Sequence, residues 1–110
     1  MKPETLTALK ESIKHWERNA FGPIGEASVY SDDCSLCIRF DNDDEFSCTL
    51  NGERCPVYER TDETVCRGTP YEGISELLYY ARVKGGETAY RNAAKAELEF
   101  LKSLLPEGEA

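Results

Sequence analysis

The sequence predicts an α+β fold that is mainly α-helical, with three amphipathic helices and a cysteine-rich β-hairpin module inserted between the first and second. Apolar residues recur at steps of three and four in three separate segments. All five cysteines fall within residues 34–66, and that segment contains the turn-forming pair Asn51-Gly52. The 110 residues suit a single domain, 1–110, in which the module takes up about residues 31–68.

The first helix is expected from about residue 3 to residue 20. Pro3 is well placed in a first turn, and Gly22-Pro23 ends the helix. His15 lies roughly opposite the apolar stripe, so we expect an exposed helix residue and not a metal ligand or a general base. The stripe consists of Leu6, Leu9, Ile13, Trp16 and Ala20.

The module contains the best hairpin signal in the chain. Residues 22–33 are expected to form a loop, after which Ser31 or an adjacent Asp could cap a short helical turn that carries Cys34 and Cys37. With Asn51-Gly52 as a two-residue turn, residue 50 pairs with residue 53 and residue 49 with residue 54. Cys48 and Cys55 then face each other across the ribbon, at about 5.5 Å between their Cα atoms.

Two further helices follow the module. Thr69, Pro70 and Glu72 match a capping box, which predicts a helix start at that point and an end at Gly85-Gly86. Its apolar residues are Ile74, Leu77, Leu78 and Ala81. The last helix is expected over about residues 88–105, with a stripe of Tyr90, Ala94, Leu98, Leu101 and Leu105.

The cysteines are expected to bind metal. The N-terminal segment lacks the apolar core of a signal peptide, and no apolar run approaches the ~20 residues that cross a bilayer. We therefore expect a cytoplasmic protein that does not enter the membrane. In a reducing compartment, five cysteines indicate metal binding more than disulfides, and an odd number does not close into pairs.

A single structural zinc ion is the favoured interpretation. Zinc takes four soft ligands in a tetrahedron, and a C-x-x-C pair supplies two from one turn. Four of the five cysteines would bind it: Cys34, Cys37, Cys48, Cys55 and Cys66. Cys34 and Cys37 are the first choice, and Cys66 is slightly preferred among the others. An iron–sulfur cluster, redox use of Cys34 and Cys37, and buried thiols without metal remain as alternatives.

Acidic residues concentrate in the same module. Residues 31–66 contain ten acidic and three basic side chains, and this accounts for most of the net charge of −8. A nucleic-acid surface needs the opposite charge, so we do not expect one at the module. A surface for binding a protein is expected at Asp32, Asp33, Asp41, Asp43, Asp44 and Glu45. A calcium loop starting at Asp41 fails because its sixth and twelfth positions would be Phe46 and Gly52.

Several stretches carry a family resemblance that covers nearly the whole chain. They are residues 15–19 (HWERN), 32–37 (DDCSLC), 55–61 (CPVYERT), 66–71 (CRGTPY) and 96–106 (AELEFLKSLLP). Together they resemble a group of small, uncharacterised cysteine-rich proteins encoded by bacteriophages and prophages. The resemblance implies the cytoplasm of a bacterial host cell. In that group a further cysteine usually lies just ahead of the Cys-Pro pair, whereas here Cys48 lies seven residues before Cys55.

These observations favour a small zinc-binding, phage-type protein that acts as an acidic protein-interaction module, with a host protein as its partner. No acid–base or nucleophile constellation is evident in the sequence, so we expect a binding protein more than an enzyme. The alternative is a zinc-ribbon-like nucleic-acid binder that works through Arg82, Lys84, Arg91 and Lys95, near the junction of the last two helices.

Overall fold

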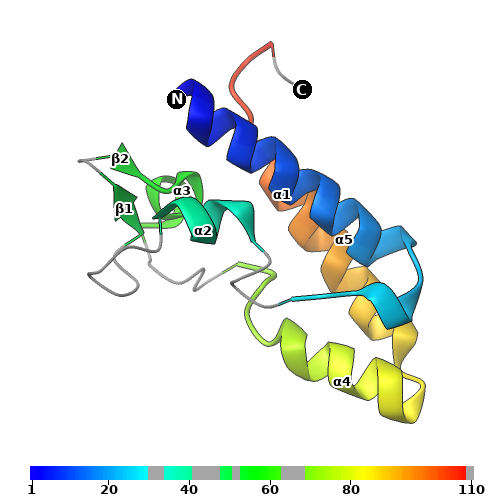
Figure 1. Ribbon diagram of the computed structural model, residues 1–110. Coiled ribbons are helices and arrows are strands. Elements are labelled where there is room, and N and C mark those ends of the chain that lie inside the picture. Colours follow the sequence, from blue (N-terminus) through cyan, green and yellow to red (C-terminus); the bar gives the residue numbers. More distant parts are fainter. Residues whose placement is uncertain (30–33, 41–47, 51–52, 63–68, 109–110) are drawn as a thin grey trace.

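Two long antiparallel helices, α1 (Pro3–Phe21) and α5 (Glu87–Ser103), pack side by side and form the axis of the molecule (Figure 1). The computed structural model describes residues 1–29, 34–40, 48–50, 53–62 and 69–108. Both predicted stripes are confirmed, with Leu6 and Leu105 half-buried at their ends. The buried stripe residues are Leu9, Ile13, Trp16, Ala20, Tyr90, Ala94, Leu98 and Leu101.

A third helix, α4 (Ile74–Lys84), packs against α5 and against the short 3₁₀ helix η1 (Ile24–Glu26). It ends at Gly85, whose φ of +79° suits glycine because that residue has no Cβ to clash. Only Gly85 and Gly86 separate α4 from α5, so the two helices form a tight helical hairpin. The buried face of α4 consists of Ile74, Leu78 and Ala81.

The predicted start of this helix is wrong by several residues. Thr69 Oγ1 accepts a hydrogen bond from the backbone N–H of Tyr71, which caps a turn ahead of the helix. Gly73 then adopts a φ of +80°, a left-handed conformation that interrupts the helical path, and α4 begins at Ile74. Tyr71 explains the interruption: its hydroxyl donates to the carbonyl of Val29, and its ring packs edge-on against Trp16.

The remaining elements lie together on one side of the α1–α5 pair (Figure 1). They are α2 (Ser35–Phe40), β1 (Thr49–Leu50), β2 (Glu53–Arg54) and α3 (Pro56–Thr61). We call these elements, together with Cys34, Cys48 and Cys55, the cysteine lobe. Its apolar residues Leu36, Phe40 and Val57 are buried in the same core as the long helices. The fold is thus mainly helical, as predicted, and the strands are two residues long.

None of the helices in the described ranges combines the length and the apolar character that crossing a membrane requires.

Candidate metal centre

Cys34 and Cys37 lie at the start of α2, where the sequence predicted a short helical turn. The carbonyl of Cys34 accepts the helical hydrogen bond of Ile38, and the backbone N–H of Cys37 donates to Cys34 Sγ at 3.4 Å. A hydrogen bond with the Cys37 side chain lowers the pKa of Cys34 to about 6, against the opposing effect of burial. Near neutral pH Cys34 is therefore largely a thiolate, which is the form that binds metal.

Ser12 of helix α1 contacts both Cys34 and the first turn of α2. Ser12 is 1% exposed, and its Oγ lies 3.8 Å from Cys34 Sγ. The same oxygen accepts a 3.4 Å hydrogen bond from the backbone N–H of Leu36. Ser12 thus fixes the first turn of α2 against α1 and contributes to the lowered pKa of Cys34.

Cys48 and Cys55 lie directly across from each other beside the β ribbon. The strands pair antiparallel with Thr49 opposite Arg54 and Leu50 opposite Glu53, which is the predicted register. The backbone N–H of Cys55 continues the ladder by donating a 2.8 Å hydrogen bond to the carbonyl of Cys48. Cys48 has a φ of +55°, an uncommon conformation for a non-glycine residue. The predicted turn at residues 51–52 lies outside the described residues.

Cys55 connects the two cysteine pairs. Its side chain is 7% exposed, and burial raises the pKa of its thiol to about 11. Charge on Cys48 and on Cys34 raises that pKa further, so Cys55 lies within electrostatic range of both. Among the described residues, Cys34, Cys37, Cys48 and Cys55 are not joined by disulfide bonds. Hydrogen bonds link Cys37 to Cys34 and Cys55 to Cys48, and an electrostatic interaction links Cys34 to Cys55.

Glu97 of α5 lies within electrostatic range of Cys34. It is 3% exposed, and burial raises the pKa of its carboxyl group to about 7. The charge of Cys34 raises the pKa further, while a backbone hydrogen bond from Tyr71 opposes the shift. The sequence pattern does not single out Glu97, because it immediately precedes Leu98 of the apolar stripe, a position that also suits an exposed acid.

Across the described ranges, no group of three or more His, Cys, Asp or Glu side chains is arranged so that it could hold a metal ion. Cys66, the slightly preferred third ligand, lies outside those ranges. So do all six residues of the expected acidic surface: Asp32, Asp33, Asp41, Asp43, Asp44 and Glu45.

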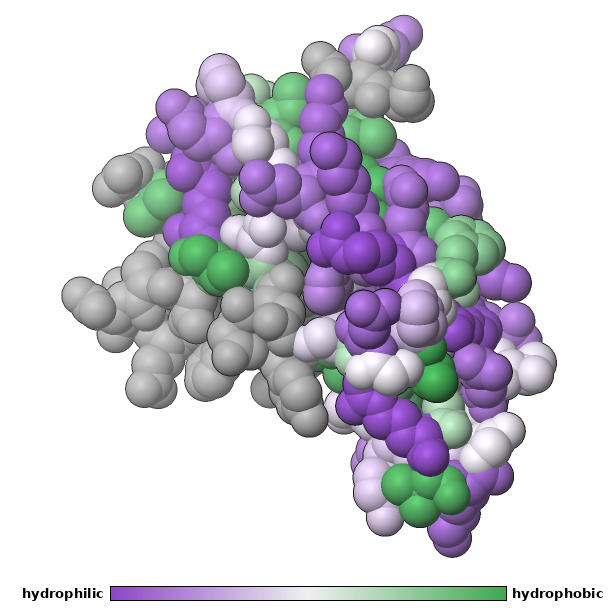
Figure 2. Space-filling model, turned by 45° about the vertical axis from the view of Figure 1, so that its right-hand side comes forward, coloured by the Kyte–Doolittle hydropathy of each residue, from purple (hydrophilic) through white to green (hydrophobic). Residues whose placement is uncertain are grey.

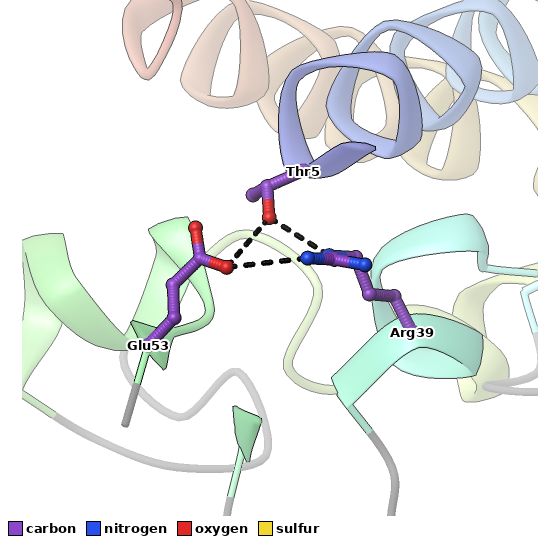
Figure 3. A network of polar contacts seen from close by, with 3 residues as sticks. All are labelled: Thr5, Arg39 and Glu53. Atoms are coloured by element: carbon purple, nitrogen blue, oxygen red, sulfur yellow. Dashed lines mark hydrogen bonds and ion pairs between the residues drawn. The ribbon is translucent and has the colours of Figure 1, made fainter. Parts of the chain in front are cut away.

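A partly buried polar cluster joins the lobe to the first turn of α1 (Figure 3). The Thr5 hydroxyl donates to Glu53 Oε1 at 2.9 Å and accepts from Arg39 Nε at 2.8 Å. Arg39 also forms a 3.3 Å ion pair with Glu53. At the far end of the lobe, Arg60 of α3 donates to the carbonyl of Ser103 at the end of α5. The lobe is therefore attached to both long helices.

His15 is not the exposed residue that the sequence predicted. Its side chain is half-buried, and Nε2 lies 2.7 Å from the carbonyl oxygen of Ser28. Asn19, one turn later on α1, both donates to that carbonyl and accepts from the N–H of Ser28. These contacts hold the segment after η1 against α1, which supports a structural role for His15.

The four cations of the alternative hypothesis lie on α4 and α5, and Arg82, Lys84 and Lys95 are exposed. Arg82 donates to the carbonyl of Ala27, and Arg91 donates to the carbonyl of Asn19 and to Glu87. The ammonium groups of Lys84 and Lys95 lie over the rings of Tyr80 and Phe21, respectively. Arg82 and Arg91 thus hold parts of the fold together, and the nucleic-acid alternative stays a prediction.

No family model matches the chain, and neither the curated proteins nor the solved structures contain a match.

Proposed function

We propose that the protein binds one zinc ion through Cys34, Cys37, Cys48 and Cys55, whose thiols would draw together around the ion from their present positions. We further propose that it acts as a binding protein whose acidic segment, residues 31–66, contacts a basic partner. The observation that carries the proposal is the position of Cys55. It lies opposite Cys48 on the ribbon and within electrostatic range of Cys34, which in turn is bonded to Cys37.

The donor chemistry fits zinc. The four candidate ligands are thiols, and one of them already has the lowered pKa of a metal-binding thiolate. A bound cation would also favour the thiolate form of the other cysteines, including Cys55, whose pKa burial raises to about 11. Cys48 and Cys55 are preferred to Cys66 as the second pair because their backbones are hydrogen-bonded to each other.

The ion would act as a structural cross-link. Its ligands come from two segments, residues 34–37 and 48–55, whose regular elements are a six-residue helix and a pair of two-residue strands. Elements this short do not hold a shape in isolation, since an isolated hairpin or single helical turn is marginal in water. A metal bound by both segments would supply the missing stability, as structural zinc does in small domains.

The partner hypothesis rests on charge. Residues 31–66 carry a net charge of −7 in the sequence. A dense negative surface favours partners with a basic surface and speeds their association. A host protein in a bacterial cell, which the phage-type resemblance suggests, would supply such a partner.

Metal analysis with cysteine variants tests the ligand set. Single serine substitutions at Cys34, Cys37, Cys48 and Cys55 should each reduce zinc affinity by at least about tenfold in a competition assay with a chromogenic chelator. Cys66→Ser is the matched control and should retain wild-type affinity. Loss of zinc in Cys66→Ser but not in Cys48→Ser would contradict the proposed set.

Capture from a bacterial lysate tests the partner. The variant with Asp41, Asp43 and Asp44 all changed to Lys should lose basic partners that the wild type retains at low salt. A matched variant has Glu4, Glu11 and Glu17 of α1 changed to Lys. Its net charge equals that of the first variant, but it should retain the basic partners. Equal recovery with all three proteins would remove the acidic-surface proposal.

A further inference from the structure

The outer face of α4 carries apolar and aromatic side chains that the described part of the chain leaves exposed. Ile74, Leu78 and Ala81 are buried, whereas Tyr79, Tyr80 and Val83 on the remaining surface are 58%, 48% and 59% exposed. The rings of Tyr79 and Tyr80 pack edge-to-face with centroids 5.6 Å apart. Figure 2 shows green and pale side chains among purple ones at the lower end of the molecule, where α4 lies.

Two opposite charges flank this patch in a regular order. Glu76 lies four residues before Tyr80 and Lys84 four residues after it, and both are exposed. Glu76, Tyr80 and Lys84 therefore follow one i, i+4 ridge of the helix, and the two charged residues lie about 6 Å before and after Tyr80 along the helix axis. Tyr79 and Val83 form the neighbouring ridge. We call these five residues the α4 outer face.

This order is self-complementary. If two copies of α4 cross antiparallel about a two-fold axis near Tyr80, Glu76 of each copy lies opposite Lys84 of the other. The tyrosine rings and Val83 then meet at the centre of the contact. We infer that the α4 outer face is a homodimer contact, in which two symmetric Glu76–Lys84 pairs set the antiparallel alignment.

The same features favour a second copy over other partners. The face carries one carboxylate and one ammonium group, those of Glu76 and Lys84, so it lacks the clustered cations that bind nucleic acid. Two helices of about three turns bury less than the ~1,200 Å² of a standard stable interface. We therefore expect a weak dimer that forms with increasing concentration. The proposal does not depend on the metal.

Sedimentation equilibrium of the full-length, zinc-supplemented protein from micromolar to millimolar concentration tests this inference. The wild type should change from monomer to dimer across this range. Glu76→Lys and Lys84→Glu should each weaken association by about tenfold or more, because each turns two attractive contacts into two repulsive ones. Circular dichroism should show unchanged helix content, since both positions are exposed.

Charge-swapped variants distinguish a specific pairing of residues 76 and 84 from a general effect of net charge on association. The double variant Glu76→Lys/Lys84→Glu should dimerise like the wild type. An equimolar mixture of the two single variants should form heterodimers, because each then supplies the charge that the other needs. The exposed α1 residues provide matched controls, and Glu17→Lys and Lys14→Glu should leave association unchanged. A wild type that stays monomeric at millimolar concentration, or single variants that associate like the wild type, would overturn the inference.

Discussion

The side-chain oxygen of Thr5 accepts a 2.8 Å hydrogen bond from Nε of Arg39, and this contact joins the first turn of α1 to α2. Thr5 is 0% exposed and also donates to Glu53 of β2, so one small hydroxyl connects three elements. Because buried polar groups must remain paired, the cluster fixes how the cysteine lobe sits on the helices.

Replacing Thr5 by Val tests this attachment. Valine has nearly the same shape but cannot bond to Arg39 or Glu53, so the free energy of unfolding should fall by about 1–3 kcal/mol. Urea denaturation monitored by circular dichroism measures the change. Thr7→Val, at an exposed position of the same helix, is the control and should alter the stability by less than about 0.5 kcal/mol. Equal effects at both positions would remove the role assigned to Thr5.

Removing the hydroxyl group of Tyr90 and that of Tyr71 should have different effects on the stability of the fold. Among the described residues, the buried Tyr90 Oη has no hydrogen-bond partner, so Tyr90→Phe should leave the stability unchanged or raise it. Tyr71→Phe removes the bond to the Val29 carbonyl and should lower the stability by about 1 kcal/mol. Thermal unfolding of both variants measures the difference, and a larger loss for Tyr90→Phe would contradict the packing described here.

Thiol reactivity should differ sharply between Cys34 and Cys55 in the chelator-treated, reduced protein. The pKa of Cys34 is lowered to about 6 and that of Cys55 is raised to about 11. Alkylation by iodoacetamide at pH 7 should therefore modify Cys34 well before Cys55, since only the thiolate reacts. Peptide mapping by mass spectrometry at timed intervals resolves the two sites. Modification of Cys55 first would show that the two environments are assigned wrongly.

Stability should fall with rising pH because of Glu97. Its pKa in the folded protein is raised from 4.5 to about 7, so the folded state retains a proton that the unfolded state has lost. The stabilisation is present below about pH 4.5 and is lost as the pH rises through 7, by roughly 3 kcal/mol at most. Glu97→Gln removes this dependence.

The readout is the difference between the free energies of unfolding of Glu97→Gln and the wild type, followed by urea denaturation between pH 5 and pH 8.5. This difference should shift in favour of the variant as the pH increases. Glu99→Gln, at an exposed site on the same helix, should show no such trend. A constant difference for Glu97→Gln would mean that the carboxyl group is not held protonated.

Sequence patterns predicted those parts of the fold that depend on local periodicity. The stripes from Leu9 to Ala20 and from Tyr90 to Leu101 gave the two long helices, and Asn51-Gly52 gave the register that pairs residues 49 and 54. Contacts distant in sequence were harder to foresee. The capping pattern at Thr69 predicted a helix start, but Tyr71 is held by Val29 and Trp16, and the helix begins later.

The candidate site was predictable only in part, for the same reason. The C-x-x-C spacing and the hairpin register indicated the pairs Cys34–Cys37 and Cys48–Cys55. The approach of Cys55 to Cys34 depends on how the lobe folds onto α1, which local pattern does not encode. Helix α3 was also missed, although Pro56 at its first position is a common helix-start signal. A six-residue helix is too short to show a periodic stripe.

The thermal unfolding of the reduced protein, with and without a strong zinc chelator, tests the central claim most directly. A cross-linking ion bound only by the folded lobe should raise the melting temperature, so chelation should lower it by about 10 °C or more and readdition of zinc should restore it. The same melting temperature with zinc and with chelator would contradict a structural metal at Cys34, Cys37, Cys48 and Cys55.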